Sequence, residues 1–226
     1  MAKITYIGHS AVEIQSGGFS ILIDPFITGN PVAVQKPENF TPNAILLTHA
    51  HMDHVGDAVP LAKKHNCPIV ATFELASYCQ SQGAPNIVGM NTGGVKDFEF
   101  GTVMLTPAFH SSSMDGKYMG LACGIVLTTK DGKRIYHAGD TALFGDMALI
   151  GKKGLDLALL PIGSHFTMDP EAAVEAVKLL TPKQVIPIHY NTFPPIQQDA
   201  SAFQRAVEGQ TSSRVVIIKP GESHEF

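Results

Sequence analysis

The sequence lacks the features that mark secreted, membrane-spanning and disulfide-bonded proteins. No apolar run approaches the roughly 20 residues that a membrane helix needs. The first ten residues, MAKITYIGHS, alternate like a strand and contain no signal-peptide core. Only three cysteines are present, Cys67, Cys79 and Cys123, and none forms a C-x-x-C pair. We expect them to be reduced, buried thiols in a soluble, cytoplasmic protein.

Charge is also scarce. Charged residues make up 16% of the 226 residues, and the formal net charge is −4. This balance gives no general attraction to nucleic acid or to anionic membranes, so neither is an expected partner. The chain has no short repeat, low-complexity tract or linker, and 44% of it is hydrophobic. We therefore expect a single domain over residues 1–226. For the assembly of this domain, a homo-oligomer is left open as an alternative to a monomer.

Short apolar or alternating segments predict strands in both halves of the chain. They cover residues 3–7, 11–15, 19–23, 44–47, 69–71, 87–89, 95–98, 102–106, 122–128, 134–137, 157–160, 185–188 and 215–219. Helices are expected from about residue 53 to 63–65, with a break near Pro60, and over 73–82, 170–180 and 200–208. Each half ends in strand–helix alternation, which predicts two β-sheets packed face to face with helices outside.

A proline-rich loop separates the third and fourth expected strands. Residues 24–43 contain four prolines, which remove backbone donors and block regular structure. A loop of this length inside a compact domain is more often functional than idle. We expect it to act as a lid or wall over the site.

Histidine and aspartate gather directly after the strand at 44–47. His49, His51, Asp53 and His54 fall within six residues, and imidazole and carboxylate are the usual ligands of borderline divalent metals. His49 and His51 point the same way in extended chain, whereas Asp53 and His54 follow a turn into a helix. One metal could not use all four ligands without strain, so the segment predicts two metal sites.

Further candidates follow other strand ends. His110 can complete the first site, His189 can complete the second, and the two oxygens of Asp140 can bridge both. His9 is expected near the leaving group as a proton donor or hydrogen-bond partner, and His165 is a candidate for lining the site.

The segment Thr48-His-Ala-His-Met-Asp-His-Val-Gly-Asp57 resembles the metal-binding signature of the metallo-β-lactamase superfamily. Five further motifs follow in that family's order: Tyr6-Ile-Gly-His-Ser10, Leu22-Ile-Asp-Pro-Phe26, Pro107-Ala-Phe-His-Ser111, His137-Ala-Gly-Asp-Thr141 and Ile188-His-Tyr-Asn-Thr192. Within the superfamily the chain is most similar to small metal-dependent hydrolases and to L-ascorbate-6-phosphate lactonases.

The resemblance implies a four-layer αββα sandwich. It places His49, His51 and His110 at the first metal, places Asp53, His54 and His189 at the second, and makes Asp140 the bridge. Asp24 would support the ligand loop from behind, and Ser111, Asn30 and Asn191 would be candidate substrate contacts.

Two positions differ from other branches of that superfamily. True β-lactamases carry Cys or Ser where this chain has Asp140, and flavodiiron oxidoreductases carry Glu in place of His51 as well as a flavodoxin domain. Neither antibiotic hydrolysis nor a redox role is therefore expected. The chain also has no room for an RNA-specificity domain.

Two divalent metal ions (Zn, Mn, Ni or Fe) with two carboxylates and one hydroxide leave a centre with a charge of about +1, which favours an anionic substrate. We expect a metal-activated hydroxide, oriented by Asp53, to attack an ester-type bond, in a lactone or a phosphoester, of a small molecule. Two alternatives stay open: a phosphodiesterase acting on small phosphodiesters or cyclic nucleotides, and a non-catalytic metal-binding scaffold.

Overall fold

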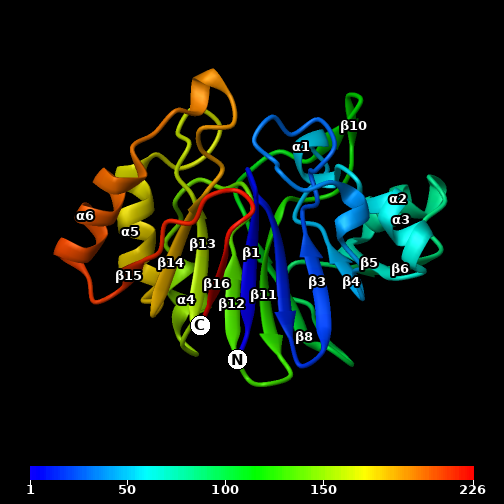
Figure 1. Ribbon diagram of the computed structural model, residues 1–226, viewed down its shortest axis with the longest axis horizontal. Helices are drawn as coiled ribbons and strands as arrows, with labels where there is room; N and C mark the ends of the chain where they lie inside the picture. The colour runs from blue at the N-terminus through cyan, green and yellow to red at the C-terminus, as the bar shows by residue number, and fades with distance from the viewer.

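A computed structural model describes all 226 residues and contains two seven-stranded sheets that face each other (Figure 1). In the first sheet, antiparallel pairing of β1, β2, β3 and β16 continues into parallel pairing of β3 to β6. Its strands, in spatial order, are β16 (Ser223–Glu225), β1 (Lys3–Gly8), β2 (Ala11–Ser16), β3 (Phe19–Ile23), β4 (Ala44–Leu46), β5 (Pro68–Thr72) and β6 (Asn86–Met90).

The second sheet has the same plan, with an antiparallel half and a parallel half. Its strands, in spatial order, are β15 (Arg214–Val215), β14 (Gln184–Ile188), β13 (Leu157–Pro161), β12 (Arg134–His137), β11 (Cys123–Thr129), β8 (Gly101–Pro107) and β7 (Val95–Phe98). A small hairpin, β9 (Ser113–Met114) and β10 (Lys117–Tyr118), stands apart from both sheets.

Helices cover the outer face of each sheet (Figure 1). The first sheet carries α2 (Ala58–His65) and α3 (Phe73–Ser81), and the second carries α4 (Met147–Gly151), α5 (Pro170–Leu180) and α6 (Ala200–Gln210). Buried side chains form one core between the sheets and one between each sheet and its helices. These layers confirm the αββα sandwich.

Most expected elements are present, and the local signals explain them. Asp169 accepts a hydrogen bond from the backbone N–H of Ala172, and Pro170 opens α5, as the capping pattern predicts. The predicted buried thiols are also found, because all three cysteines are free and buried. No helix is long and apolar enough to cross a membrane.

Two expectations about element boundaries are wrong. The helix after β4 breaks at Gly56, between α1 (Met52–Val55) and α2, rather than near Pro60. Gly56 has a φ of 39°, whereas Pro60 lies in the first turn of α2, where a missing N–H breaks no helical hydrogen bond. The expected strand over 215–219 ends at Val215, and the last strand, β16, pairs with β1 in the other sheet.

Candidate metal centre

The candidate ligands follow the carboxyl ends of strands at one edge of the sandwich. His9 follows β1, Asp24 follows β3, and the His49–His54 segment follows β4 in the first sheet. In the second sheet, His110, Asp140 and His189 follow β8, β12 and β14. Within each sheet these strands run in the same direction, so residues far apart in sequence meet at one end. In Figure 1 that end carries α1 and lies away from both termini.

The structure forms three overlapping groups of potential metal donors, two that match the predicted sites and a third, His49, His54 and Asp140, that joins them. The first group is His49, His51 and His110, with ligand atoms within 4.8 Å of one another. The Nε2 atom of His49 lies 3.0 Å from Nδ1 of His51. Both members of this pair come from the extended segment, as the spacing of two residues predicts.

The second group brings together Asp53, His54 and His189, with His9 added to the set. Asp140 lies between the groups. One of its oxygens is 3.0 Å from Nε2 of His189 and 3.5 Å from Nε2 of His110. Its other oxygen is 3.4 Å from Nε2 of His54. Asp140 thus has an oxygen near a donor of each group, and its role as a bridge between two metals stays a prediction.

Asp24 orients a histidine in each group from behind. Its carboxylate accepts hydrogen bonds from Nδ1 of His54 at 2.7 Å and from the hydroxyl of Thr48 at 2.6 Å. The Thr48 oxygen in turn accepts from Nδ1 of His49 at 3.0 Å. When His49 and His54 are neutral with the proton on Nδ1, their Nε2 lone pairs would face the centre, which is the usual arrangement behind metal-bound imidazole.

The donor set fits a divalent cation. The Nε2 atom of His54 and the oxygen of Asp140 that lies 3.4 Å from it are both buried, and neither has another hydrogen-bond partner. Burial lowers the pKa of His54, but the carboxylates of Asp140 and Asp24 more than offset it and hold that pKa well above its ordinary value. The site therefore stabilises positive charge at this point, which a metal ion could supply.

His9 lies behind Asp53 rather than at the cavity wall. Burial, together with the neighbouring His189 and His54, lowers the pKa of His9 to about 4, so its ring is neutral at pH 7. Its Nε2–H donates to Asp53 at 3.1 Å, and the Thr192 hydroxyl donates to its Nδ1 at 2.9 Å. A ring held in this way can orient Asp53.

Strained backbone concentrates around the centre. Nine non-glycine residues have φ in the left-handed region, and six of them lie in its loops: His9, Asp24, Ser164, His165, His189 and Asn191. Such conformations persist only where the surrounding structure enforces them, and they cluster at functional sites.

A cavity of about 360 Å³ opens beside the two donor groups. It is lined by His51, Asp53, His110, Ser111, Asp140, Phe166 and His189. The side chain of Ser111 approaches Nε2 of His51 at 3.3 Å. A small molecule could therefore reach both groups at once.

Three other candidates contact mainly protein. The side-chain amide of Asn30 bonds to Gly8, Phe26 and Val32, and that of Asn191 bonds to the backbone of Gln198. His165 is exposed and packs edge-on against Phe166, with ring centroids 4.4 Å apart. Substrate contact by these residues stays a prediction.

Two residues that shape the site had no role predicted from the sequence. Buried His137 donates from Nε2 to the carbonyl of Ser10 at 2.9 Å and accepts at Nδ1 from Gly139 N–H at 3.1 Å. It thereby ties the His9 loop to the Asp140 loop. Its place at the start of the His-Ala-Gly-Asp-Thr motif was the only signal. Phe166, in the cavity wall, had none.

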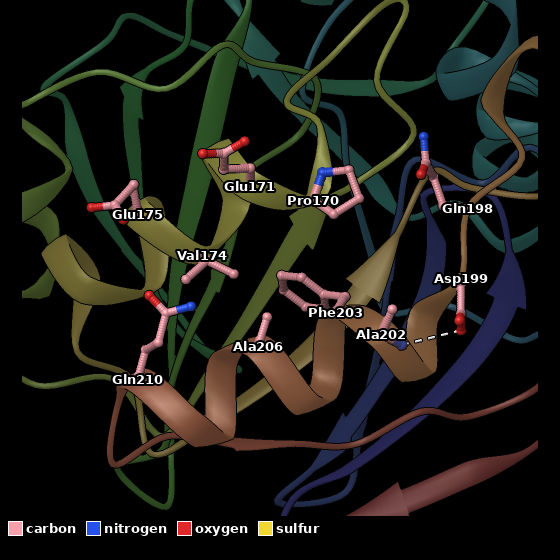
Figure 2. Close-up of a pocket in the computed structure, with 10 residues that line it drawn as sticks. All are labelled: Pro170, Glu171, Val174, Glu175, Gln198, Asp199, Ala202, Phe203, Ala206 and Gln210. Carbon is pink, nitrogen blue, oxygen red and sulfur yellow. Dashed lines mark hydrogen bonds between the residues drawn. The ribbon is translucent and has the colours of Figure 1, made fainter.

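A second cavity, of about 480 Å³, lies between α5 and α6 (Figure 2). Its lining combines Val174 and Phe203 with the acidic Glu171, Glu175 and Asp199. Asp199 is already engaged as the cap of α6, where it accepts from Ser201 and Ala202. This cavity contains none of the candidate ligands.

A family model described as a beta-lactamase superfamily domain matches residues 20–190, which is more than half of the chain. The chain belongs to the metallo-β-lactamase superfamily. This superfamily member is 55% identical over 224 residues to a UPF0173 metal-dependent hydrolase of Thermus thermophilus, covering 98% of each chain. It is 51% identical over 230 residues to a UPF0173 metal-dependent hydrolase of Pelotomaculum thermopropionicum, covering 99% of this chain and 100% of that one.

Among solved structures, this chain matches Igni18, a metallo hydrolase of the archaeon Ignicoccus hospitalis. The TM-score is 0.91 at 40% identity, covering 100% of this chain and 99% of that one. These relatives support a metal-dependent hydrolase. Three points stay predictions: the resemblance to lactonases, the number and identity of the metals, and the bond that is cleaved.

Proposed function

We propose that this chain hydrolyses an ester-type bond, in a lactone or a phosphoester, of a small anionic molecule at a centre of two divalent metal ions. The observation that carries the proposal is the pair of donor groups joined by Asp140, with a cavity reaching both. His49, His51 and His110 would hold one ion, and Asp53, His54 and His189 the other. The donors contain no thiolate, which suits Zn, Mn, Ni or Fe.

Metal ions bound there would supply Lewis acidity and lower the pKa of water to about 7. The chain's own residues supply orientation. Asp24 keeps the proton of His54 on Nδ1, and His9 donates to one oxygen of Asp53 so that this carboxylate is held in a single orientation. Burial raises the pKa of Asp53, but the hydrogen bond from His9 and the nearby His54 outweigh burial and keep it ionised.

The cavity also argues against a non-catalytic scaffold. In a scaffold, protein side chains would close the remaining positions around the ions. Here the cavity is lined by members of both donor groups, so a small molecule could reach ions held by them.

The first test is metal content together with hydrolysis. Protein purified without added metal is analysed for bound metal and then assayed, fully loaded, on a lactone panel and on bis(p-nitrophenyl) phosphate. We expect about two ions per chain and turnover of at least one ester class. Preference for the phosphodiester would favour the phosphodiesterase alternative, and absence of turnover on every ester would contradict the proposal.

The second test is the His51→Ala variant, which removes one of the three donors of the first group. We expect loss of about one metal ion per chain and a fall in turnover of at least 100-fold. His65→Ala, on the outer helix α2, is the matched control and should retain both. Full metal content and activity in His51→Ala would contradict a two-metal centre.

A further inference from the structure

Phe166 gives the cavity its one apolar wall. The other six lining residues are histidine, aspartate or serine. Phe166 is 54% exposed, so its ring is open to a bound molecule. Apolar side chains at the surface are common when they are isolated. Phe166, however, lines the same cavity as two groups of metal donors, and this position suggests a function.

The loop that carries Phe166 is held in place from both sides. Ser164 and His165 have φ of 59° and 35°, so two successive non-glycine residues are left-handed. The loop closes on itself through hydrogen bonds from Ser164 N–H to Met168 O at 3.0 Å and from Thr167 N–H to Ser164 O at 2.8 Å. Met168 N–H donates to Thr141 O at 3.1 Å, next to Asp140. The backbone that carries the ring is therefore tied to the loop that carries Asp140.

The charge of the lining matters equally. No lysine or arginine is among the seven lining residues. A second anionic group on the substrate, away from the reacting bond, would find no cation there, and its burial without a partner is unfavourable. An uncharged group, by contrast, would gain from contact with an aromatic ring.

We propose that Phe166 forms an apolar subsite, and that the substrate joins one anionic or ester-type reacting group to an uncharged aryl or alkyl group. The reacting group would lie at the two donor groups, and the apolar group would pack on the Phe166 ring. This inference rests on the proposed function and narrows it to substrates whose negative charge, where present, is on the reacting group. Substrates with a remote phosphate, such as sugar phosphates, would be poor.

The test compares ligands that share one headgroup. Methylphosphonate, phenylphosphonate and 3-phosphonopropionate are titrated into the metal-loaded protein by calorimetry. We expect phenylphosphonate to bind about fivefold more tightly than methylphosphonate, and 3-phosphonopropionate to gain nothing over methylphosphonate. In Phe166→Ala the advantage of the phenyl group should disappear while methylphosphonate affinity stays the same. Phe166→Leu should retain part of the advantage.

Leu149→Ala is the control, because Leu149 is 66% exposed on α4 and does not line the cavity. It should leave all three affinities unchanged. Equal binding of the methyl and phenyl ligands, or a Phe166→Ala variant that weakens both to the same extent, would overturn the inference.

The two proposals fail in different ways. If esters are hydrolysed but the phenyl group gives no advantage, only the Phe166 subsite is wrong. If the phenyl advantage depends on Phe166 but no ester is hydrolysed, the subsite stands and the proposed function is wrong. If no phosphonate binds the metal-loaded protein and no ester is hydrolysed, both are wrong.

Discussion

Asp24 and His137 lie behind the candidate ligands and act on them through hydrogen bonds. Asp24 connects directly to His54 and, through Thr48, to His49. His137 joins the backbone of Ser10 to that of Gly139, and these two residues lie in loops that follow strands of different sheets. At the scale of single residues, these two supporting side chains thus determine which ligand atoms face the centre and how far apart the loops lie.

Replacing His137 with Leu should therefore destabilise the metal-free protein. The Ser10 carbonyl and the Gly139 N–H would lose their partner in a buried place, which costs about 2–4 kcal/mol for the pair. Urea denaturation measures the loss, and a competition assay measures the expected weaker metal binding. His137→Gln, whose amide can still donate near the Nε2 position, should lose less. Equal stability of both variants and the wild type would contradict this role.

The break between α1 and α2 positions the ligand helix against the proline-rich loop. Asp57, at the start of α2, accepts from the backbone N–H groups of Ile27 and Thr28 and from the Thr28 hydroxyl. Gly56 makes the turn, and a Cβ there would lie 2.4 Å from the Pro25 carbonyl oxygen. At the scale of elements, a close backbone approach holds the start of this loop beside the second donor group.

Gly56→Ala should cost about 3 kcal/mol of stability, because it combines a positive φ with a clash against backbone. Gly209→Ala is the matched control. Gly209 lies in α6 with open space around its Cβ position, so alanine should stabilise the protein by roughly 0.5–1 kcal/mol. Thermal or urea unfolding measures both changes. A Gly56→Ala variant as stable as the wild type would show that the close approach at Gly56 is unimportant.

The two sheets are also joined at the end away from the site. Asp131, in the turn between β11 and β12, accepts hydrogen bonds from Ser16 at the end of β2 and from Thr129, both at 2.5 Å. These bonds, from Ser16 first and then Thr129, lower the pKa of Asp131 to about 2. At the scale of the whole molecule, this carboxylate links the first sheet to the second.

The pH dependence of that link can be predicted. Because folding lowers the pKa of Asp131, its contribution to stability is present above the ordinary pKa near 4 and is lost as the pH falls to about 2. Asp131→Asn should lower stability by about 1 kcal/mol at pH 6. The difference from the wild type should shrink by pH 2.5. Urea unfolding at both pH values measures it, with Asp115→Asn on the exposed hairpin as the carboxylate control. A constant difference would contradict the prediction.

Local patterns were sufficient for much of this protein. Alternation and apolar runs predicted most strands, because successive side chains of a strand point to opposite faces and the pattern of burial is therefore written along the sequence. The Asp169-Pro170 cap predicted the start of α5 because a capping hydrogen bond joins residues only three apart. The segment from His49 to His54 predicted a metal-binding site because its four donors fall within six residues.

Tertiary structure decided what depends on residues far apart in the chain. His137 bonds to a residue 127 positions away, and β16 pairs with β1 at the opposite end of the sequence. The place of Asp140 between the two donor groups, the position of His9 behind Asp53 and the exposure of Phe166 to the cavity all require both sheets to be packed together. No local pattern encodes such contacts, since they form only when the sandwich brings its strand ends to one edge.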